Sequence, residues 1–352
     1  MRDVIKVSAE HNYEIVFSNN WRNNLLSMVS TRSRCAVICT PTLRNVIGEL
    51  EAGDCEFLYC VIPDGEEGKN PNTLLQLWNW LAAAGFTRSD LVVGIGGGAV
   101  TDIAGFAAAT YLRGIDWIGI PTSVAGAVDA AVGGKTGANL DYGKNLIGSF
   151  YSPQSVIVDT SWFESLTDRD FSAGLAEVVK CGFIKDPEIL NLLSGKSVQD
   201  IRSNPELVSE LTVRAIQVKA TVVSGDFRES FDREILNYGH TFGHAVEKHA
   251  SYSLRHGECV SIGMAFMAHL QLELGLISRE IFDLHFSILK SLNLPVAYSK
   301  GEWVELRALM SLDKKARGES LRFVTITGLG ETSRLTDVDS SMLLAAYERV
   351  RL

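Results

Sequence analysis

Histidine is scarce in this chain, with seven in 352 residues, yet His240, His244 and His256 lie in one short segment. His240 and His244 are four residues apart, so on a helix both imidazoles would project from one face. His256 follows a loop and precedes an apolar run to residue 270 that indicates a second helix. Two such histidines and one carboxylate would bind zinc or a similar ion and leave one position open to substrate. Ordinary histidines near a helix end would show the same spacing.

A carboxylate for such an ion occurs at Glu177, in an otherwise apolar helical pattern. Lys180 follows three residues later and would share its face. Because a buried charge needs a partner, an ion held by Glu177, His240 and His256 would satisfy the carboxylate. An exposed ion pair between Glu177 and Lys180 is the alternative at this spacing.

A glycine-rich turn, Gly94-Ile-Gly-Gly-Gly98, follows a predicted strand and opens a predicted helix. Glycines there let the backbone approach a pyrophosphate, and the helix N-terminus offers amide donors. A tight structural turn would use the same residues. A second polar loop, Asp64-Gly-Glu-Glu-Gly-Lys69, suits a ribose or a phosphate and is also typical of a solvated turn.

Basic and glycine residues gather between positions 113 and 145 of an otherwise acidic protein. Lysine supplies a point charge to phosphate, and the carboxylate of Asp129 in the same stretch would orient a hydroxyl. Further basic residues lie on the helices predicted beyond residue 166. The whole set comprises Arg113, Lys135, Lys144, Lys180, Lys219 and Arg233. This local reversal of sign predicts a doubly anionic small molecule as substrate.

The composition is typical of a globular protein, with 46% hydrophobic and 21% charged residues. The net charge of −9 argues against nucleic acid or an anionic membrane as a partner. The chain shows no apolar run near twenty residues and no secretory leader pattern. None of the six cysteines forms a C-x-x-C pair, so we expect buried free thiols in a reducing cytoplasm.

The first half alternates β-branched runs with helical patterns, as in a parallel sheet covered by helices. The predicted strands are 4–7 and 13–17, paired as a hairpin, then 35–39, 57–62, 91–95, 117–120 and 155–158, with helices at 71–84 and 100–111. Beyond residue 166 the predicted helices are 168–183, 187–193, 205–223, 233–249, 257–274 and 279–292, with a late strand at 322–326. We therefore expect an α/β fold with a Rossmann-like parallel-sheet domain, residues 1–165, and a mainly helical domain, residues 166–352.

Several of these segments occur together in a recognisable order. The blocks are Gly96–Asp102, Arg113-Gly, Pro121-Thr-Ser, Val128–Gly137, Gly143-Lys-Asn, Gly174–Lys180, Leu236–His244, His256-Gly-Glu and Asp313-Lys-Lys. Over nearly the whole chain they resemble the 3-dehydroquinate synthases of the sugar-phosphate cyclase superfamily. The resemblance implies an NAD-binding α/β domain, an all-helical metal-binding domain and a cytoplasmic homodimer that takes part in the shikimate pathway toward chorismate and the aromatic amino acids.

The resemblance also implies a role for individual residues. The metal, zinc or cobalt, would be held by Glu177, His240 and His256, with His244 on the substrate instead. NAD would contact Asp64, Gly65, Glu66, Glu67, Gly68, Lys69, Gly97, Gly98, Ala99, Val100, Thr101, Asp102, Thr122, Ser123, Lys135, Lys144, Trp162, Phe163, Glu164 and Ser165. The substrate would contact Asp129, Lys135, Asn145, Lys180, Lys219, Arg233, Asn237, His244 and either Lys314 or Lys315, with Arg113 reaching from a partner subunit.

The implied reaction converts 3-deoxy-D-arabino-heptulosonate 7-phosphate, which carries a phosphate and a carboxylate, to 3-dehydroquinate. It runs through transient oxidation at C5 by NAD, β-elimination of phosphate, re-reduction, ring opening and aldol closure. A cyclase acting on sedoheptulose 7-phosphate or glucose 6-phosphate is one alternative, although these substrates have no carboxylate to use both Lys219 and Arg233. A metal-dependent polyol dehydrogenase would release NADH, and a non-catalytic sugar-phosphate-binding protein would have no need of the metal ligands.

Overall fold

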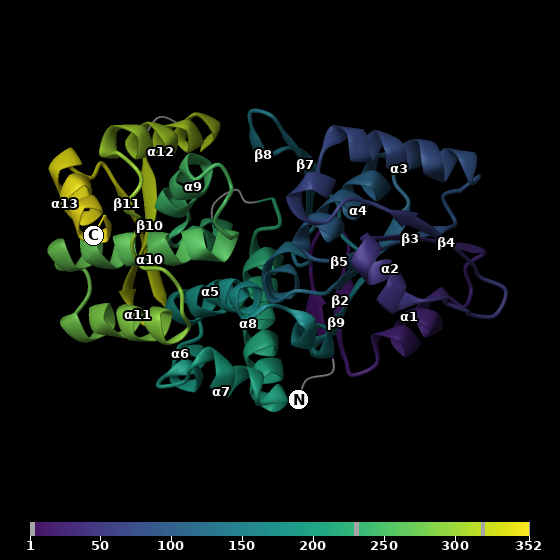
Figure 1. Ribbon diagram of the computed structural model, residues 1–352, viewed down its shortest axis with the longest axis horizontal. Coiled ribbons are helices and arrows are strands. Elements are labelled where there is room, and N and C mark those ends of the chain that lie inside the picture. Colours follow the sequence, from purple (N-terminus) through teal and green to yellow (C-terminus); the bar gives the residue numbers. More distant parts are fainter. Residues whose placement is uncertain (1–3, 229–231, 318–320, 352) are drawn as a thin grey trace. The chain divides into compact units, whose positions relative to one another are not determined.

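The computed structural model describes residues 4–228, 232–317 and 321–351, except for the side chains of 312–317. The chain divides into two compact units (Figure 1). The first comprises Met1–Ser165 and Lys219–Arg228, and the second comprises Leu166–Val218 and Glu229–Leu352. Helix α8 (Pro205–Gly225) therefore contributes residues to both units.

The first unit is built on a seven-stranded sheet with the strand order β1-β2-β9-β6-β5-β3-β4. Its strands are β1 (Val4–Val7), β2 (Tyr13–Ser18), β3 (Arg34–Cys39), β4 (Glu56–Val61), β5 (Leu91–Gly96), β6 (Asp116–Pro121) and β9 (Ser155–Asp159). All neighbouring strands are parallel except β1 and β2, which form the predicted antiparallel hairpin. The strands predicted in the first half are thus confirmed, and β5 and β9 are buried on both faces, as their continuous apolar runs indicate.

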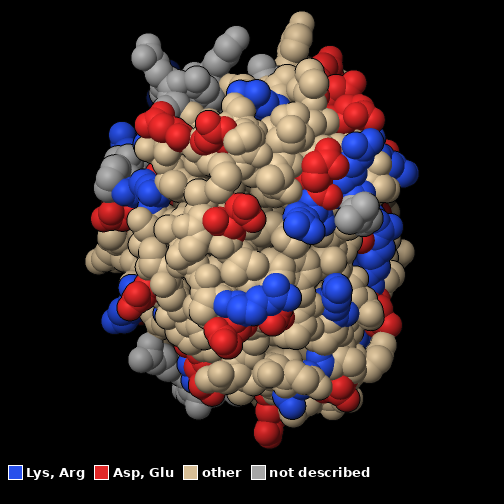
Figure 2. Space-filling view, turned by 90° about the vertical axis from the view of Figure 1, so that its left-hand side faces the viewer, with Lys and Arg blue, Asp and Glu red and all other residues tan. Residues whose placement is uncertain are grey.

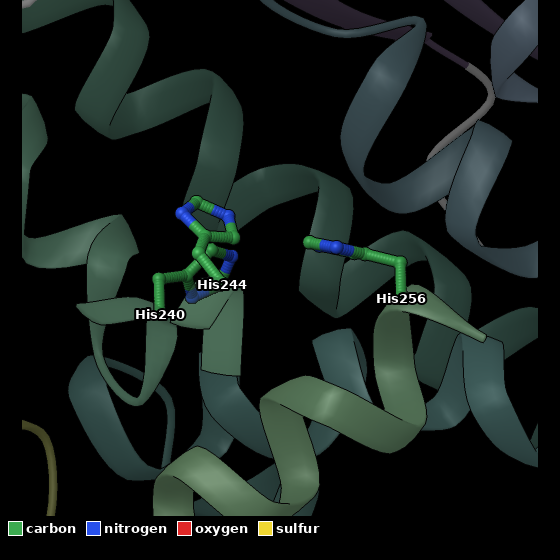
Figure 3. A group of neighbouring side chains, drawn as sticks. All are labelled: His240, His244 and His256. Atoms are coloured by element: carbon green, nitrogen blue, oxygen red, sulfur yellow. The ribbon is translucent and has the colours of Figure 1, made fainter. Parts of the chain in front are cut away.

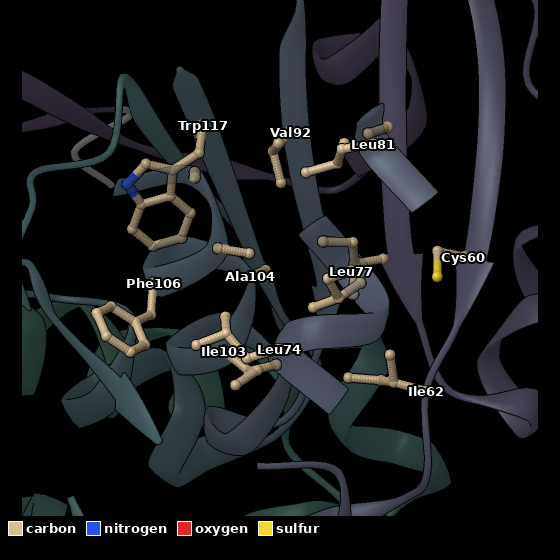
Figure 4. Close-up of a cluster of buried hydrophobic side chains, with 14 of the residues drawn as sticks. Cys60, Ile62, Leu74, Leu77, Leu81, Val92, Ile103, Ala104, Phe106 and Trp117 are labelled. Atoms are coloured by element: carbon tan, nitrogen blue, oxygen red, sulfur yellow. The ribbon is translucent and has the colours of Figure 1, made fainter. Parts of the chain in front are cut away.

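Helices α3 (Pro71–Ala83) and α4 (Gly98–Thr110) cover the sheet and enclose a continuous apolar core (Figure 4). Leu77, Ile103 and Trp117 lie within this core and are nearly inaccessible to solvent. Two more helices were not predicted from the sequence, namely α1 (Trp21–Val29), which contacts β9, and α2 (Pro41–Ile47). The short helical segments are η1 (Gly65–Gly68), η2 (Tyr111–Arg113), η3 (Gly126–Ala130) and η4 (Thr160–Ser165).

The basic, glycine-rich stretch of the first unit forms a second, two-stranded sheet. Strand β7 (Lys135–Leu140) pairs antiparallel with β8 (Gly143–Phe150), and β7 contacts α4. No strands were predicted in this stretch of the sequence. The hairpin brings Lys135, Lys144 and Asn145 onto one small element of the first unit.

The second unit is helical apart from one β-hairpin. Its helices are α5 (Asp168–Ile184), α6 (Glu188–Leu193), α7 (Val198–Arg202), the first part of α8, α9 (His240–His249), α10 (His256–Glu273), α11 (Arg279–Ser291), α12 (Trp303–Arg317) and α13 (Ser340–Val350), with η5 (Asp232–Asn237) before α9. The hairpin joins β10 (Arg322–Gly328) to β11 (Glu331–Thr336), and β10 includes the late strand predicted at 322–326. Helix α10 is buried along most of its length and packs against α5, α9, α11 and α13.

One predicted helix is wrong in its extent. Residues 233–249 were expected to form one continuous helix, but the structure has η5, a break, and then α9. The break lies at Gly239, whose φ of +77° is a left-handed conformation that glycine adopts at low cost. As a result Arg233 and Asn237 precede His240 without continuing its helix.

All six cysteines are buried and free. Burial raises the pKa of Cys39 and of Cys60 to about 11, so both remain thiols at neutral pH. On the face shown in Figure 2, basic and acidic side chains are interspersed. Among the described residues, no helix combines the length and apolar character needed to cross a membrane.

Candidate active site

Glu177 on α5 faces two histidines from neighbouring helices of the second unit. Its Oε1 lies 3.6 Å from His240 Nε2 and 3.4 Å from His256 Nε2. The residue is 1% exposed, and this oxygen has no hydrogen-bond partner among the described residues. The other oxygen accepts a hydrogen bond from Lys180, which is 2% exposed. The alternative of an exposed ion pair is therefore wrong, and a divalent cation beside Oε1 would relieve the cost of burying it without a partner.

The other ring nitrogen of each histidine contacts an oxygen. His240 Nδ1 lies 3.1 Å from the backbone carbonyl of Tyr238, and His256 Nδ1 lies 3.3 Å from Glu247 Oε2. Because both oxygens accept a hydrogen bond, each Nδ1 carries the proton, and the lone pair of each neutral ring lies on the Nε2 that faces Glu177. Histidines that bind metals in proteins usually make such an outer contact. The residues present thus fit a divalent ion such as zinc.

The charges in this cluster shift the pKa values of its members. Burial by itself raises the pKa of Glu177, but Lys180 and the two imidazoles hold that pKa well below its usual range. Burial, together with Lys180, holds the pKa of His240 well below its usual range. Burial also opposes a charge on His256, yet the carboxylates of Glu177 and Glu247, one beside each ring nitrogen, raise its pKa to about 10. A proton and a metal ion therefore compete for Nε2 of His256.

Close contacts between helix backbones place these ligands within reach of one another. A Cβ atom at Gly263 of α10 would lie 1.8 Å from the carbonyl oxygen of Gly239, so α9 and α10 can pack this closely only around glycine. At Gly257, the residue after His256, a Cβ atom would lie 1.7 Å from the carbonyl oxygen of Ala173 on α5. The backbone of α10 is therefore in direct contact with the backbone at the start of α9 through Gly263 and with that of α5 through Gly257.

A group of ion pairs fixes the start of α10. Glu258 accepts two hydrogen bonds from Arg169 of α5, at 2.6 and 2.8 Å, and one from the backbone of Arg255 at 2.8 Å. Arg255 in turn donates to Asp170 at 2.6 Å. These contacts connect the first turn of α5 to the residues on either side of His256. The Glu of the His256-Gly-Glu block therefore has a structural role.

His244 is the third member of a histidine cluster on α9 and α10 (Figure 3). One potential ligand atom from each of His240, His244 and His256 lies within 4.8 Å of the others. The rings of His240 and His244 have centroids 5.2 Å apart, while those of His244 and His256 are 5.8 Å apart. The histidines alone would thus permit a three-histidine site. The buried, unpartnered oxygen of Glu177 favours the predicted set of Glu177, His240 and His256.

Other predicted substrate residues lie near this cluster along the chain. Arg233 is 1% exposed in η5, and Asn237 ends that segment three residues before His240. Lys314 and Lys315 belong to α12, but their side chains lie outside the described residues.

In the first unit, Lys219 and Asp129 form a pair across 90 residues of sequence. The Lys219 ammonium donates to the side-chain carboxylate and the backbone carbonyl of Asp129, which lies in η3. Lys219 is 6% exposed. Two predicted substrate residues are therefore in direct contact with each other.

A second polar cluster of the first unit joins the 64–69 loop to the β7–β8 hairpin. Lys69 is 3% exposed and donates to the carboxylate of Asp102 and to the side-chain oxygen of Asn145. Burial raises the pKa of Asp102, and Lys69 opposes that shift. Glu66 lies 3.7 Å from Lys144. The cluster thus combines residues predicted to bind NAD with Asn145, which was predicted to contact substrate.

The glycine-rich turn joins β5 to α4, as predicted. No side chain caps the N-terminus of α4, where Gly97 precedes the first helical residue. A Cβ atom at Gly97 would meet only Ser123 Oγ, at 3.5 Å, so the space beside the first turn is open. These features fit a pyrophosphate at the helix N-terminus. Gly98, Ala99, Val100 and Thr101 form the first turn of α4, and the Thr122 amide donates to Gly96 at the start of this turn.

The remaining predicted residues are more scattered within the first unit. Trp162, Phe163, Glu164 and Ser165 form most of η4, where the buried Trp162 indole nitrogen has no partner among the described residues. Arg113 has a left-handed backbone and is exposed, as is Lys135 at the start of β7. Within the described structure, no hydrogen bond or ion pair connects Arg113 to either polar cluster.

Glu247 is a residue of the site that the sequence analysis missed. It lies seven residues after His240 on α9, which puts it on the same helical face, and it is 4% exposed. That spacing was the available signal, because a carboxylate one further turn along a histidine-bearing face is placed to contact a second histidine.

Comparison with known proteins agrees with this architecture. The chain superposes on the structure of 2-epi-5-epi-valiolone synthase ValA from Streptomyces hygroscopicus, bound to NAD+ and Zn2+, with a TM-score of 0.90 and 29% identity over 98% of each chain. A probable glycerol dehydrogenase from Sinorhizobium meliloti shares the fold, with a TM-score of 0.59, 14% identity and 95% coverage of each chain. The predicted fold class is confirmed: a parallel-sheet unit and a helical unit of the kind found in these enzymes.

The family within this class follows from the sequence relatives. Residues 59–173 match the 3-dehydroquinate synthase N-terminal family, and residues 174–316 match the 3-dehydroquinate synthase C-terminal family. A 3-dehydroquinate synthase of Paenarthrobacter aurescens is 45% identical over 99% of this chain and 98% of its own length. One of Streptomyces avermitilis is 43% identical over 96% of this chain and 94% of its own length. The chain belongs to the 3-dehydroquinate synthase family.

Proposed function

We propose that this protein is a 3-dehydroquinate synthase, which converts 3-deoxy-D-arabino-heptulosonate 7-phosphate to 3-dehydroquinate and phosphate. Membership of the family supports this activity, and the observation that carries it is the buried Glu177 oxygen, which lies between two histidines and accepts no hydrogen bond from the described residues. NAD+ bound by the first unit would supply the transient oxidation at C5, and a metal held by Glu177, His240 and His256 would polarise the neighbouring substrate oxygens. The enzyme therefore releases phosphate without net oxidation.

In this proposal Glu177, His240 and His256 hold the metal through Oε1 and two Nε2 atoms. The carboxylate brings one negative charge to a divalent ion, and three protein ligands leave a position for substrate oxygen. Lys180 donates to the outer oxygen of Glu177 and so fixes the carboxylate rotamer. Lys180 is close enough to the site to contact a substrate hydroxyl as well.

The proposed NAD site occupies the first unit. The N-terminus of α4 receives the pyrophosphate, and the loop 64–69 with Asp102, Thr122, Ser123, Lys144 and the segment 162–165 surrounds the rest of the cofactor. The open space beside Gly97 and the cluster of Lys69 and Asp102 support this placement.

The substrate carries two anionic groups, and the basic side chains divide between them. Lys135, Asn237, His244 and Lys314 or Lys315 take the phosphate in this proposal, while Lys219 and Arg233 take the carboxylate. Asp129 and Asn145 bind ring hydroxyls. The positive charges of Arg233 and Lys219 support a role with an anionic group.

We also propose a homodimer in which Arg113 reaches the phosphate in the partner subunit. The exposure of Arg113 and its left-handed backbone at the end of η2 support an outward-directed side chain. A reducing cytoplasm is the proposed location, because all six cysteines are free.

The test is phosphate release. The protein is incubated with the heptulosonate phosphate, NAD+ and zinc, and inorganic phosphate and NADH are measured together. We expect stoichiometric phosphate and no accumulation of NADH. NADH formed in step with substrate consumption would instead identify a dehydrogenase. Sedoheptulose 7-phosphate, in a parallel reaction, should release little phosphate, because it offers no carboxylate to Lys219 and Arg233.

A further inference from the structure

Among the described hydrogen bonds, Glu247 is the one side chain that contacts Nδ1 of His256. Its Oε2 lies 3.3 Å from His256 Nδ1, and the residue is 4% exposed on α9. The other nitrogen of the same imidazole, Nε2, lies 3.4 Å from the Glu177 carboxylate. His256 thus lies between two carboxylates, one on each ring nitrogen.

The two histidines of the centre are held in different ways. The His240 side chain is 10% exposed, and its Nδ1 contacts the Tyr238 carbonyl, which belongs to the backbone two residues earlier. The His256 side chain is 35% exposed and begins α10 directly after a loop. Packing and local backbone therefore constrain His256 less than His240. The contact from Glu247 on another helix supplies the missing constraint.

An imidazole can bind a metal through Nε2 only if that atom carries the lone pair. A carboxylate on Nδ1 favours the required tautomer, fixes the plane of the ring and makes Nε2 a better donor. A metal-binding histidine so oriented loses less rotamer freedom when the ion arrives. Glu247 is positioned to do each of these things for His256.

We propose that Glu247 is a positioning residue that orients His256 and increases the affinity of the centre for its divalent ion. The inference rests on the metal centre of the proposed function, and it assigns Glu247 no contact with the substrate. It predicts that both the position and the charge of the carboxylate matter. Glutamine at position 247 would keep an acceptor oxygen for Nδ1 without the charge, whereas alanine would remove both.

The test measures metal binding in the absence of substrate. Glu247→Gln, Glu247→Ala and the unchanged protein are titrated with Co2+ in competition with a chelating dye, and the visible absorption of bound Co2+ is recorded. Alanine should weaken Co2+ binding by about 10- to 100-fold, with a smaller loss for glutamine. The cobalt spectrum of the alanine variant should change, because the ligand field responds to the orientation of His256 and a purely structural defect elsewhere would leave it unaltered.

The chain offers a matched control at a second histidine of α9, whose carboxylate partner lies on α12. Glu305 lies 3.0 Å from His249 Nε2, so Glu305→Gln also neutralises a carboxylate paired with a histidine of α9. This variant should bind Co2+ like the unchanged protein. Melting of each metal-free variant, followed by circular dichroism, shows whether it is folded.

The possible results distinguish an error in the role of Glu247 from an error in the metal centre itself. If His256→Ala loses Co2+ but both Glu247 variants bind it within twofold of the unchanged protein, the positioning role is wrong and the metal centre stands. If His256→Ala retains full Co2+ affinity, the centre itself is wrongly assigned. If Glu247→Ala does not fold, Glu247→Gln is tested in its place. An unchanged Co2+ affinity and an unchanged cobalt spectrum for Glu247→Gln would then contradict the positioning role.

Discussion

A single oxygen atom distinguishes this metal centre from an ordinary cluster of buried polar groups. The two oxygens of Glu177 have different partners, since Lys180 contacts one and two imidazoles lie near the other. An ion pair alone would have satisfied the charge of the carboxylate. The asymmetry instead leaves one carboxylate oxygen and two imidazole nitrogens as donors for a divalent ion.

A second buried network contacts the metal ligands through Tyr238, and its histidine makes the stability of the second unit depend on pH. His285 is fully buried, stacks on Phe183 with ring centroids 3.6 Å apart, and accepts a hydrogen bond from Tyr238 at 2.9 Å. Gln271 donates to the same tyrosine oxygen at 3.0 Å. Because Tyr238 also presents its carbonyl to His240, this network supports a metal ligand from within the core.

Burial lowers the pKa of His285 to about 4, and this predicts a loss of stability in acid. The unfolded chain has a histidine pKa near 6.5, so it binds more protons than the folded protein between about pH 4 and 6.5. The stabilisation is complete above about pH 6.5 and is lost as the pH falls through that window, by about 3 kcal/mol in total.

Urea unfolding at several pH values measures this contribution. His285→Gln should lower stability at neutral pH, since the stack on Phe183 is lost, but its stability should fall less between pH 6.5 and 4 than that of the unchanged protein. Parallel pH profiles for the two proteins would show that His285 is not the titrating group.

At the scale of the elements, the ligand geometry depends on how closely α10 lies to its neighbours. A Cβ atom at Gly263 would lie 1.8 Å from the Gly239 carbonyl, where no real contact is so short. We therefore expect Gly263→Ala to separate α9 from α10 and to cost about 1–3 kcal/mol of unfolding free energy. The separation would also move His240 away from His256 and weaken metal binding.

Gly225→Ala is the control for that substitution, because a Cβ atom there would meet nothing within 4 Å. Stability by urea unfolding and Co2+ affinity by dye competition should both stay near the values of the unchanged protein. If Gly263→Ala behaved like Gly225→Ala in both measurements, the close packing of α9 and α10 would not be what sets the ligand spacing.

The elements also show what the sequence could and could not reveal. Continuous apolar strands such as β5 were predictable, because burial on both faces leaves an unbroken β-branched run. The β7–β8 hairpin was not, since its glycines and charges indicate a ligand-binding loop more than a strand. The break before α9 was missed because a glycine inside a helical pattern is compatible with either a continuous helix or a left-handed stop.

The candidate site also contains residues that could be predicted from the sequence and contacts that could not. Glu177, His240 and His256 were proposed from their chemistry and from the family resemblance, and they lie together in the structure. The spacing along α9 places Glu247 on the face that carries the histidines, but its contact with His256 also depends on how α9 and α10 cross, which the sequence does not specify. Likewise, the ion pairs of Glu258 were not predictable, because they depend on the packing of α5 against α10.

At the scale of the whole molecule, the two units have their own cores and are expected to bind different cofactors. Five of the six tryptophans, at positions 21, 78, 80, 117 and 162, belong to the first unit, whereas Trp303 belongs to the second. Fluorescence of a Trp303→Phe protein therefore reports on the first unit alone. Circular dichroism reports on both units.

Adding metal should stabilise the second unit selectively. At a free Zn2+ concentration 100 times the dissociation constant, mass action adds about 2.7 kcal/mol to the folded state that binds the ion. We expect the melting curve by circular dichroism to shift upward more than the curve by fluorescence of the Trp303→Phe protein. Equal shifts would mean that the two units unfold as one cooperative body.

The buried thiols have a practical consequence for measuring motion in this protein. A maleimide reacts with an exposed thiolate, and none of the six native cysteines presents one. A cysteine introduced at Val304, which is 78% exposed at the start of α12, would therefore be the preferred site for a fluorescent or spin label. Pairs of such positions would report distances within the working enzyme without first removing any natural cysteine.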